Sequence, residues 1–396
     1  MKNIIFGLIS LAILIGIGFI VSEDKKKINW KTVGLGLLGQ AILVFFVVRV
    51  PVGKVILEKI AFGFNKVFQF GNEGLNFVFG DLATKQHTMV INVLGMIVFT
   101  STLIAVLYFF KVIPLLIKYV GGAIAKLLKV TKIEAMICVS NALLGGSEAP
   151  LVIKNYLPTV KRSELFVVMA SGFSSASVGI LAGYQAMGFP LEYMLIAVFT
   201  VPFSCLMISK MIIPSEAEVE DIKDVEVTGE EYSNIFDAIA SGANTGMQVA
   251  FAVGATLIGF LGIIAIINSV LGMVGLSLSE ILGWFFTPFA WLLGIPAGEV
   301  GIFAESLGIK IGVNEFVAFD SLSQAVSSGG VSPRTLAILT TALTNFANFS
   351  VIGIVGSSLS SLAPNRAKEV AGFGLKALLV GTLSTMVTAT LVAMMV

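Results

Sequence analysis

The sequence predicts an all-α polytopic membrane protein with eight transmembrane helices, two re-entrant helical hairpins and an inverted repeat that contains two discontinuous helices. The 396-residue chain is 56% hydrophobic and 12% charged, with a mean hydropathy of +0.97. Soluble domains contain about 25% charged residues, so this composition indicates a chain that lies mostly in lipid. Two short polar interruptions, each with a lone glutamate, occupy matching places in the two halves, and this duplication predicts the repeat.

Eight apolar windows are long enough to cross a bilayer, which requires about 20 residues each. They lie near residues 3–21, 32–50, 89–110, 163–187, 190–212, 247–270, 335–360 and 373–396. An even number of crossings places both termini on one side. Basic residues gather in the 23–27 loop and between Lys111 and Arg162, so the positive-inside rule places these segments in the cytoplasm and both termini outside the cytoplasmic (inner) membrane.

Three segments do not fit simple crossings. The lysines of residues 51–88 would lie outside, but acidic residues are interspersed among them, so this segment is interpreted as an amphipathic surface helix. Residues 112–162 and 273–332 are too polar for one crossing and too apolar for a loop. Each is predicted to form an amphipathic helix and then a re-entrant hairpin, whose tip must be buried in protein or line a wet cavity. Because an odd number of crossings separates the hairpins, the repeat is inverted.

These elements predict five regions along the chain. They are residues 1–110, N-terminal scaffold spans and an amphipathic helix; 111–213, the first repeat with its hairpin, broken helix and following span; 214–246, an acidic cytoplasmic linker and an amphipathic helix; 247–372, the second repeat with a span, a hairpin and a broken helix; and 373–396, the last span. The acidic run from Glu216 to Glu231 is interpreted as a solvated linker.

Composition excludes several classes of function. The net charge of +1 gives no indication of a nucleic-acid partner. Cys138 and Cys205 lie in apolar stretches and are expected to be reduced and buried, and the single histidine, His87, argues against a histidine-built metal centre. No P-loop, zinc motif or nucleophile elbow occurs, so we expect neither an enzyme nor a bound organic cofactor.

Glu148 and Glu315 are the glutamates of the two interruptions. An ionisable group inside the membrane costs at least about 2.5 to 3.5 kcal/mol and indicates a functional site by default. A cap at the N-terminus of the returning half-helix is a compatible structural role. The neutral polar residues nearby suit an uncharged ligand with hydroxyls or amides, and they are Asn141, Ser147, Asn314 and Asn348. The other acids of these segments are expected to face the membrane interface, and they are Glu134, Glu299, Glu305 and Asp320.

Each interruption is followed by an apolar helix broken by small polar residues. Aligning Phe173 with Phe346 also superposes Ser175 on Asn348, as expected of a duplication. A break of this kind frees backbone carbonyls and offers hydroxyls, which hold a hard cation in other membrane proteins. Small residues also let membrane helices pack closely, and for residues 170–176 alone that structural explanation is favoured over a cation site.

These motifs resemble the concentrative nucleoside transporters in their bacterial eight-span form. Residues 145–150, Gly-Gly-Ser-Glu-Ala-Pro, are similar to that family's Gly-Gln-Thr-Glu-Ala-Pro hairpin motif, residues 314–318 to its Asn-Glu-Phe-Val-Ala motif, and residues 346–348 to its Phe-Ala-Asn segment. The resemblance covers essentially the whole chain. It implies a homotrimer in the lipid bilayer, with a scaffold domain and a mobile transport domain in each protomer, that imports nucleosides along a cation gradient.

The resemblance also implies roles for individual residues. Glu148 and Ser147 would face the nucleobase, Ile180 and Phe346 would be its apolar contacts, and Glu315 and Asn348 would hold the ribose hydroxyls. The Asn141 and Ser175 side chains and the carbonyls of Ala170, Ser171 and Ala176 would bind sodium as the coupling ion. Gly146 stands where the family usually has a base-contacting glutamine, and Val351 where it often has a ribose-contacting serine. The glycine is expected to leave room for a purine, and the valine leaves open how tightly the ribose is held.

Sodium symport of a nucleoside is therefore the predicted function. Proton coupling, with Glu148 or Glu315 as the titrating group, remains an alternative, although the presence of Asn141 and Ser175 favours sodium. A channel or membrane scaffold without coupled transport is a hypothesis from a different class. Accumulation of a neutral ligand against its gradient separates the two, because a channel cannot accumulate it.

Overall fold

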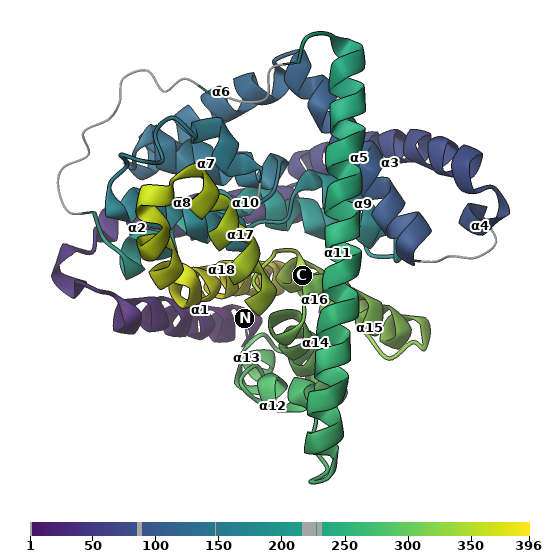
Figure 1. The fold of residues 1–396 in the computed structure, drawn as a ribbon. Coiled ribbons are helices and arrows are strands. Elements are labelled where there is room, and N and C mark those ends of the chain that lie inside the picture. Colours follow the sequence, from purple (N-terminus) through teal and green to yellow (C-terminus); the bar gives the residue numbers. More distant parts are fainter. Residues whose placement is uncertain (1, 85–88, 147, 216–226, 228–231) are drawn as a thin grey trace.

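The computed structural model describes residues 2–84, 89–146, 148–215, 227 and 232–396, and all regular elements within these residues are helices (Figure 1). The α-helices are α1 (Lys2–Val21), α2 (Trp30–Arg49), α3 (Pro51–Phe79), α4 (Asp81–Thr84), α5 (Gly95–Phe109), α6 (Val112–Leu128), α7 (Lys132–Leu143), α8 (Arg162–Ser174), α9 (Val178–Ala186), α10 (Leu191–Ile212), α11 (Ile235–Gly272), α12 (Leu278–Trp284), α13 (Thr287–Leu292), α14 (Val300–Gly312), α15 (Glu315–Ser327), α16 (Pro333–Leu343), α17 (Phe349–Leu362) and α18 (Ala367–Met395). Short 3-10 helices are η1 (Lys25–Lys27), η3 (Ala149–Ile153), η4 (Ala297–Glu299) and η5 (Pro364–Arg366), and η2 (Met89–Leu94) is a π-helix. The predicted all-helical class is confirmed.

Six helical segments within the described residues are long and apolar enough to cross a membrane. They are Asn3–Val21, Trp30–Arg49, Ile91–Phe109, Arg162–Ala186, Leu191–Ile212 and Pro364–Met395. The two other expected windows correspond to α11 and to the pair α16 and α17. The total of eight crossings stays a prediction.

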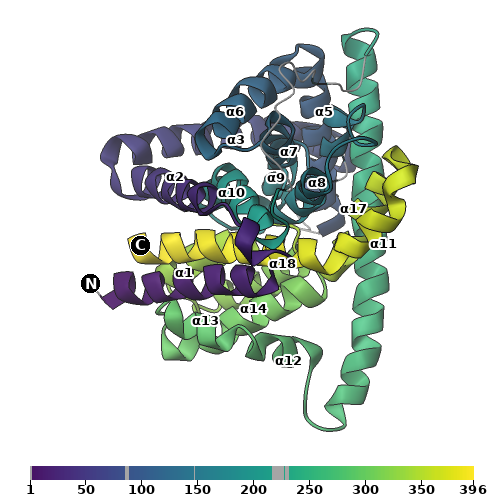
Figure 2. The same cartoon turned by 90° about the vertical axis from the view of Figure 1, so that its left-hand side faces the viewer.

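The six segments divide into an interior group and a peripheral group. Within the molecule, 94% of the α8–α9 and α10 windows and 78% of the α18 window are buried, against 28% for α1 and α2. Helices α1 and α18 lie side by side, and the two ends of the described chain lie at the same side of the molecule (Figure 2). The interior group therefore forms the protein core, while α1, α2 and α5 present more of their apolar surface outward.

The two polar interruptions form turns between paired arms. In the first, a capping box between Thr131 and Glu134 starts α7, and the chain turns at Gly145, whose φ of 105° is readily adopted only by glycine. The return is the short 3-10 helix η3, not a full helix. In the second, α14 and α15 pack against each other, and the Asn314 side chain caps α15 by accepting from the backbone N–H of Val317 at 3.0 Å. Whether these pairs re-enter the membrane stays a prediction.

Both duplicated helices are broken where the small polar residues gather. Ser175 and Ser177 adopt extended backbone conformations that separate α8 from α9. In the second half, α16 ends at Leu343 and α17 begins after Asn348, whose side chain accepts from the backbone N–H of Val351 at 3.2 Å. A cap at this position satisfies a helix N-terminus that would otherwise have free donors inside the protein.

Helix α11 differs from the prediction. Its 38 residues form one rod of about 57 Å that runs along one side of the molecule (Figures 1 and 2). The expected boundary between an amphipathic helix and a span, at residue 246, falls inside it, because no proline interrupts the segment and Asn234 caps its start. Gly242 and Gly246 let α11 approach the backbone of α5 closely. Most of the expected acidic linker, including residues 216–226 and 228–231, lies outside the described residues, as does His87.

The acids expected at the interface have different environments, and the expectation is wrong for Glu134. Its side chain is fully buried and forms an ion pair with Lys210 of α10, because the first turn of α7 packs directly against that helix. Glu305 and Asp320 are exposed, and Glu299 accepts from the Ser332 hydroxyl at 2.9 Å. The two cysteines are free and buried as predicted, with 3.8 Å between their sulfur atoms.

Candidate functional site

A cavity lies where the two hairpin turns, the two helix breaks, α5 and α11 meet. Its empty space is about 1040 Å³, a volume that includes the opening to solvent. The hairpins and broken helices supply most of its polar groups, whereas Ile97 and Ile104 of α5 and Val249 and Val253 of α11 form an apolar opposing wall. Two parts of the fold thus face each other across the cavity.

Most of the predicted substrate residues line this cavity. They are Gly146, Glu148, Ile180, Glu315, Phe346, Asn348 and Val351. Ser147 lies outside the described residues. Residues that are far apart in the sequence and belong to both repeats therefore surround one space, although their roles toward a ligand stay predictions.

Glu315 is held rigidly at the start of α15. Its side chain is buried, with Oε1 accepting from the Tyr184 hydroxyl at 3.2 Å and Oε2 from Asn348 Nδ2 at 3.0 Å. An ionised carboxylate has about four acceptor positions, so two remain for other donors. The position also places the negative charge at a helix N-terminus, where the helix dipole favours it.

Asn348 connects this carboxylate to the second helix break. Its amide nitrogen donates to Glu315, while Oδ1 accepts from the Val351 backbone at 3.2 Å and from the Ser350 hydroxyl at 2.6 Å. These bonds fix the orientation of the amide, since reversing it would set donors against donors. The turn of the second hairpin and the start of α17 are thereby joined at the cavity surface.

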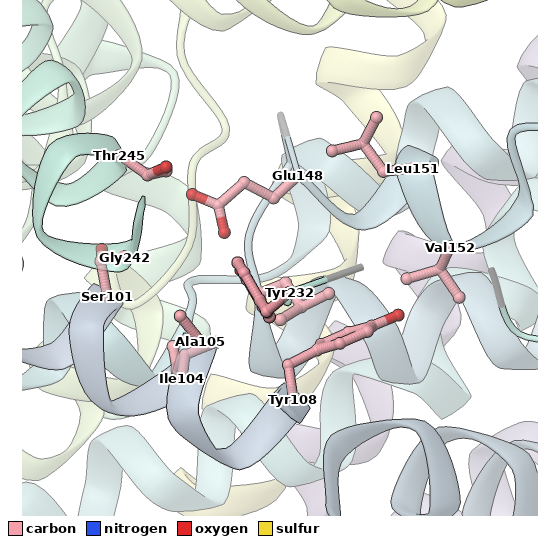
Figure 3. A pocket seen from close by; sticks show the side chains of 11 residues that line it. Ser101, Ile104, Ala105, Tyr108, Glu148, Leu151, Val152, Tyr232, Gly242 and Thr245 are labelled. Carbon is pink, nitrogen blue, oxygen red and sulfur yellow. The ribbon is translucent and has the colours of Figure 1, made fainter. Parts of the chain in front are cut away.

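Glu148 occupies the corresponding turn of the first hairpin, immediately before η3. Its side chain makes no capping bond to that helix, so the proposed structural role as a cap does not apply in this conformation. The carboxylate extends into a second space of about 490 Å³ beside the main cavity, toward Thr245 of α11 and Ser101 of α5 (Figure 3). Glu148 lines both spaces.

The predicted sodium ligands lie near the C-terminal ends of α7 and α8 and in the break that follows α8, and all are buried. Asn141 Nδ2 donates to the Ser171 hydroxyl at 2.7 Å and to the Ile137 carbonyl at 3.1 Å. The Ala170 carbonyl accepts from Ser174, and the Ala176 carbonyl accepts from Ser175. The Asn141 Oδ1 atom is buried without a hydrogen-bond partner.

An acceptor in that position costs free energy unless a donor or a cation satisfies it. The group consists of carbonyl, amide and hydroxyl oxygens, which are ligands for a hard cation. Among the described residues there is no cluster of three or more His, Cys, Asp or Glu side chains suited to a transition metal. The residues present therefore fit sodium.

The expectation of open space beside Gly146 is wrong. A Cβ atom at this position would lie 3.0 Å from the Gly172 carbonyl oxygen and 3.1 Å from Val355 Cγ2. The glycine is needed because the first hairpin and α8 touch through their backbones. Room for a larger base would therefore have to come from elsewhere in the cavity.

The sequence did not reveal several residues around the site. Tyr184 is a lone tyrosine in the apolar helix α9, and no local pattern indicates that its hydroxyl reaches Glu315. Thr100 and Ser101 of α5 line the cavity but lie in a helix that reads as an ordinary span. Lys310 is buried in α14. The one sequence feature that indicates it is a charge within an apolar arm, five residues before Glu315.

Known proteins share this arrangement. The chain matches the families described as Na+ dependent nucleoside transporter C-terminus over residues 193–393 and Na+ dependent nucleoside transporter N-terminus over residues 9–82. The nucleoside permease NupC of Helicobacter pylori is 38% identical over 410 residues, which cover 99% of this chain and 98% of the permease. The structure of CNTnw in an inward-facing substrate-bound state has a TM-score of 0.95 and 38% identity, and the match covers 100% of both chains. A two-residue variant of CNTnw in an outward-facing state has a TM-score of 0.94 and 37% identity, with 99% of this chain and 98% of that chain covered. The chain therefore belongs to the Na+-dependent nucleoside transporters, a family of membrane transport proteins and not of enzymes.

Proposed function

We propose that this protein imports nucleosides across the cytoplasmic membrane by sodium-coupled symport and alternating access. The observation that carries the proposal is the buried Glu315 carboxylate, which is held by Tyr184 and Asn348 and lines the cavity between the two hairpin turns. Membership of the Na+-dependent nucleoside transporter family by itself establishes only that the protein transports nucleosides. The geometry supports a more specific assignment of how the substrate and the ion are held.

The substrate is bound through its sugar and its base. The two acceptor positions left on Glu315 match the two adjacent hydroxyls of a ribose, which would donate charge-assisted hydrogen bonds to it. Ile180, Phe346 and Val351 supply apolar surface for the uncharged remainder of the molecule. Glu148, on the opposite hairpin turn, faces the nucleobase, where it accepts from base N–H donors.

The coupling ion binds at Asn141 Oδ1, the buried oxygen that has no hydrogen-bond partner. Asn141 and Ser171 belong to two elements, α7 and α8, whose separation would break the site. A sodium ion between them therefore stabilises the first hairpin against the broken helix. Because Gly146 of the same hairpin touches Gly172 of α8, an ion that fixes this contact also fixes one wall of the substrate cavity.

Alternating access follows from the two facing parts of the cavity. The hairpins and broken helices carry the polar ligands and would move together, while α5 and α11 form the apolar wall past which they move. CNTnw structures exist in both inward-facing and outward-facing states with this fold. A homotrimer, with one such pathway in each protomer and lipid around it, completes the proposal.

Uptake of labelled nucleoside into proteoliposomes tests the proposal. Sodium and proton gradients are imposed separately, and a third sample has neither gradient. We expect accumulation above the equilibrium level with the sodium gradient alone. Accumulation with the proton gradient alone would assign the coupling to protons, and equilibration without accumulation under all three conditions would indicate a channel.

A further inference from the structure

We propose that Lys310 is a tethered cation that occupies, in the second repeat, the place that corresponds to the sodium site of the first repeat. Each transport cycle would then move one coupling ion, because the second half carries its own cationic side chain. The inference rests on the proposed cation site at Asn141.

The environment of Lys310 is unusual for a lysine. Its side chain is 2% exposed, and the ammonium donates to the Ala342 carbonyl oxygen at 2.5 Å. Ala342 lies in the last turn of α16, directly before the second helix break. A positive charge is favoured at this end of a helix, where free carbonyl groups give the dipole its negative pole. Glu315 begins the other arm of the same hairpin.

The first repeat has a similar arrangement of helix end and polar side chain, but the side chain is an amide and not an ammonium. Asn141 stands two residues before the last residue of α7, and Lys310 stands two residues before the last residue of α14. Each side chain reaches the C-terminal turn of the first half of a broken helix, Asn141 through Ser171 and Lys310 through Ala342. In the first repeat that side chain presents a buried oxygen without a partner, whereas in the second it presents an ammonium.

Charge explains why the two repeats need different groups. Lys132, at the start of α7 and nine residues before Asn141, is the one basic residue of the first hairpin, residues 132–153. A positive charge at the first helix break therefore has to come from solution and not from this hairpin. At the second break, the Lys310 ammonium supplies that charge and fills the space of an ion. A buried charge needs a polar partner, and the Ala342 carbonyl is that partner for the Lys310 ammonium.

The number of charges moved per nucleoside tests the inference. Purified wild-type protein in proteoliposomes is set at a series of membrane potentials, and the potential at which net nucleoside flux vanishes gives the ratio. We expect one charge per nucleoside for wild type and for Lys310→Arg, which keeps the tethered cation. The Lys310→Asn variant recreates the oxygen ligand of the first repeat, so its ratio should rise toward two. The double variant Glu134→Gln/Lys210→Met is the matched control, since it removes a buried lysine away from both helix breaks without leaving its partner unpaired, and it should leave the ratio at one.

Two results would overturn the inference. A wild-type ratio of two would show that the second repeat binds an ion in spite of Lys310. An active Lys310→Asn variant with a ratio of one would show that Lys310 does not replace an ion. If Lys310→Asn does not transport, nucleoside binding to purified Lys310→Ala decides: restored binding on addition of methylammonium supports the inference, and unrestored binding by folded protein contradicts it. Wild-type uptake driven only by protons would remove the proposed sodium coupling, yet the charge ratio would still test Lys310.

Discussion

At the residue scale, the contacts of the Glu315 carboxylate give the sharpest expectation for ligand binding. Glu315→Gln sets an amide N–H₂ against donors from Tyr184 or Asn348 and removes the charge. Charge-assisted hydrogen bonds contribute about 1.5 to 3 kcal/mol each, so we expect nucleoside affinity to fall roughly tenfold to a hundredfold. Isothermal titration of the purified variant measures the loss.

Tyr184→Phe is the matched control for this change. It removes one donor from Glu315 but keeps the charge and the ring, so its effect should be about tenfold or less. A Glu315→Gln variant that binds nucleoside as tightly as wild type would take the carboxylate out of the binding site.

Gly146 gives a second expectation at this scale. Because a Cβ at this position meets the Gly172 carbonyl oxygen at 3.0 Å, Gly146→Ala must displace the first hairpin from α8. We expect lower uptake of adenosine and of uridine by similar factors, since the displacement changes the cavity wall and not one base contact. Competition assays with both labelled nucleosides measure this. If the uptake of only one of the two nucleosides fell, position 146 would have a role in selecting the nucleobase.

The functional residues that could be predicted from the sequence are those that belong to a recognisable motif. The polar interruptions identified Glu148, Glu315 and Asn348, because charged and amide groups stand out against apolar sequence. The contacts of Tyr184 and the crowding at Gly146 could not be predicted, since both depend on helices that meet only in the folded chain.

At the element scale, the ion pair between Glu134 and Lys210 fastens α7 to α10. Removing one member leaves a buried charge without its partner and costs about 3 to 5 kcal/mol, whereas replacing both members avoids that penalty. We expect Glu134→Gln and Lys210→Met each to lower the thermal unfolding midpoint strongly. The double variant should unfold at a higher temperature than either single variant, and a double variant with additive losses would contradict the pairing.

Helix boundaries were predictable only where the sequence marks them. Small polar residues predicted both helix breaks. Asn314 and Asn348 cap the N-termini of α15 and α17, and asparagine is a preferred residue at that position. The continuity of α11 could not be predicted because hydropathy and helix propensity both fall along residues 235–246, whereas the structure keeps the helix continuous there. Burial of Glu134 was missed because its partner, Lys210, belongs to another helix.

At the scale of the whole molecule, one ionic cluster joins the end of α1 and the start of α8 to α18. Glu23, after α1, accepts from Arg162 at the start of α8 and from Lys376 of α18. The hydrogen bond from Arg162, opposed by partial burial and helped by Lys376, lowers the pKa of Glu23 from 4.5 to about 2. The cluster lies at the surface and its side chains are partly exposed, so its contribution to stability is below about 1 kcal/mol.

This pKa shift sets a pH window. A carboxyl group whose pKa falls on folding stabilises the protein above its unfolded pKa of 4.5 and loses that contribution as the pH falls toward 2. Glu23→Gln should therefore lower the thermal midpoint slightly near neutral pH, and the difference from wild type should disappear as the pH falls through about 2. The comparison needs thermal scans of both proteins across this range. An equal difference at every pH would mean that the Glu23 charge is not responsible.

The arrangement of the molecule links the substrate cavity to the cation site through the first hairpin. Gly146 lines the cavity, and Asn141, at the other end of the same turn, reaches α8. Linkage requires that an ion which strengthens nucleoside binding is itself bound more tightly when the nucleoside is present. Composition and motifs predicted the two sites, but their connection through one turn needed the fold.

The nucleoside dissociation constant measured against sodium concentration tests this linkage most directly, in wild type and in Asn141→Ala. For wild type we expect affinity to rise with sodium and then to saturate. In Asn141→Ala, the sodium concentration for half of that rise should increase about tenfold or more, as expected for the loss of one ion ligand worth at least about 1.4 kcal/mol. The affinity at saturating sodium should stay close to that of wild type. A wild-type affinity that does not change with sodium, or an Asn141→Ala variant with unaltered sodium dependence, would contradict the coupling of the two sites.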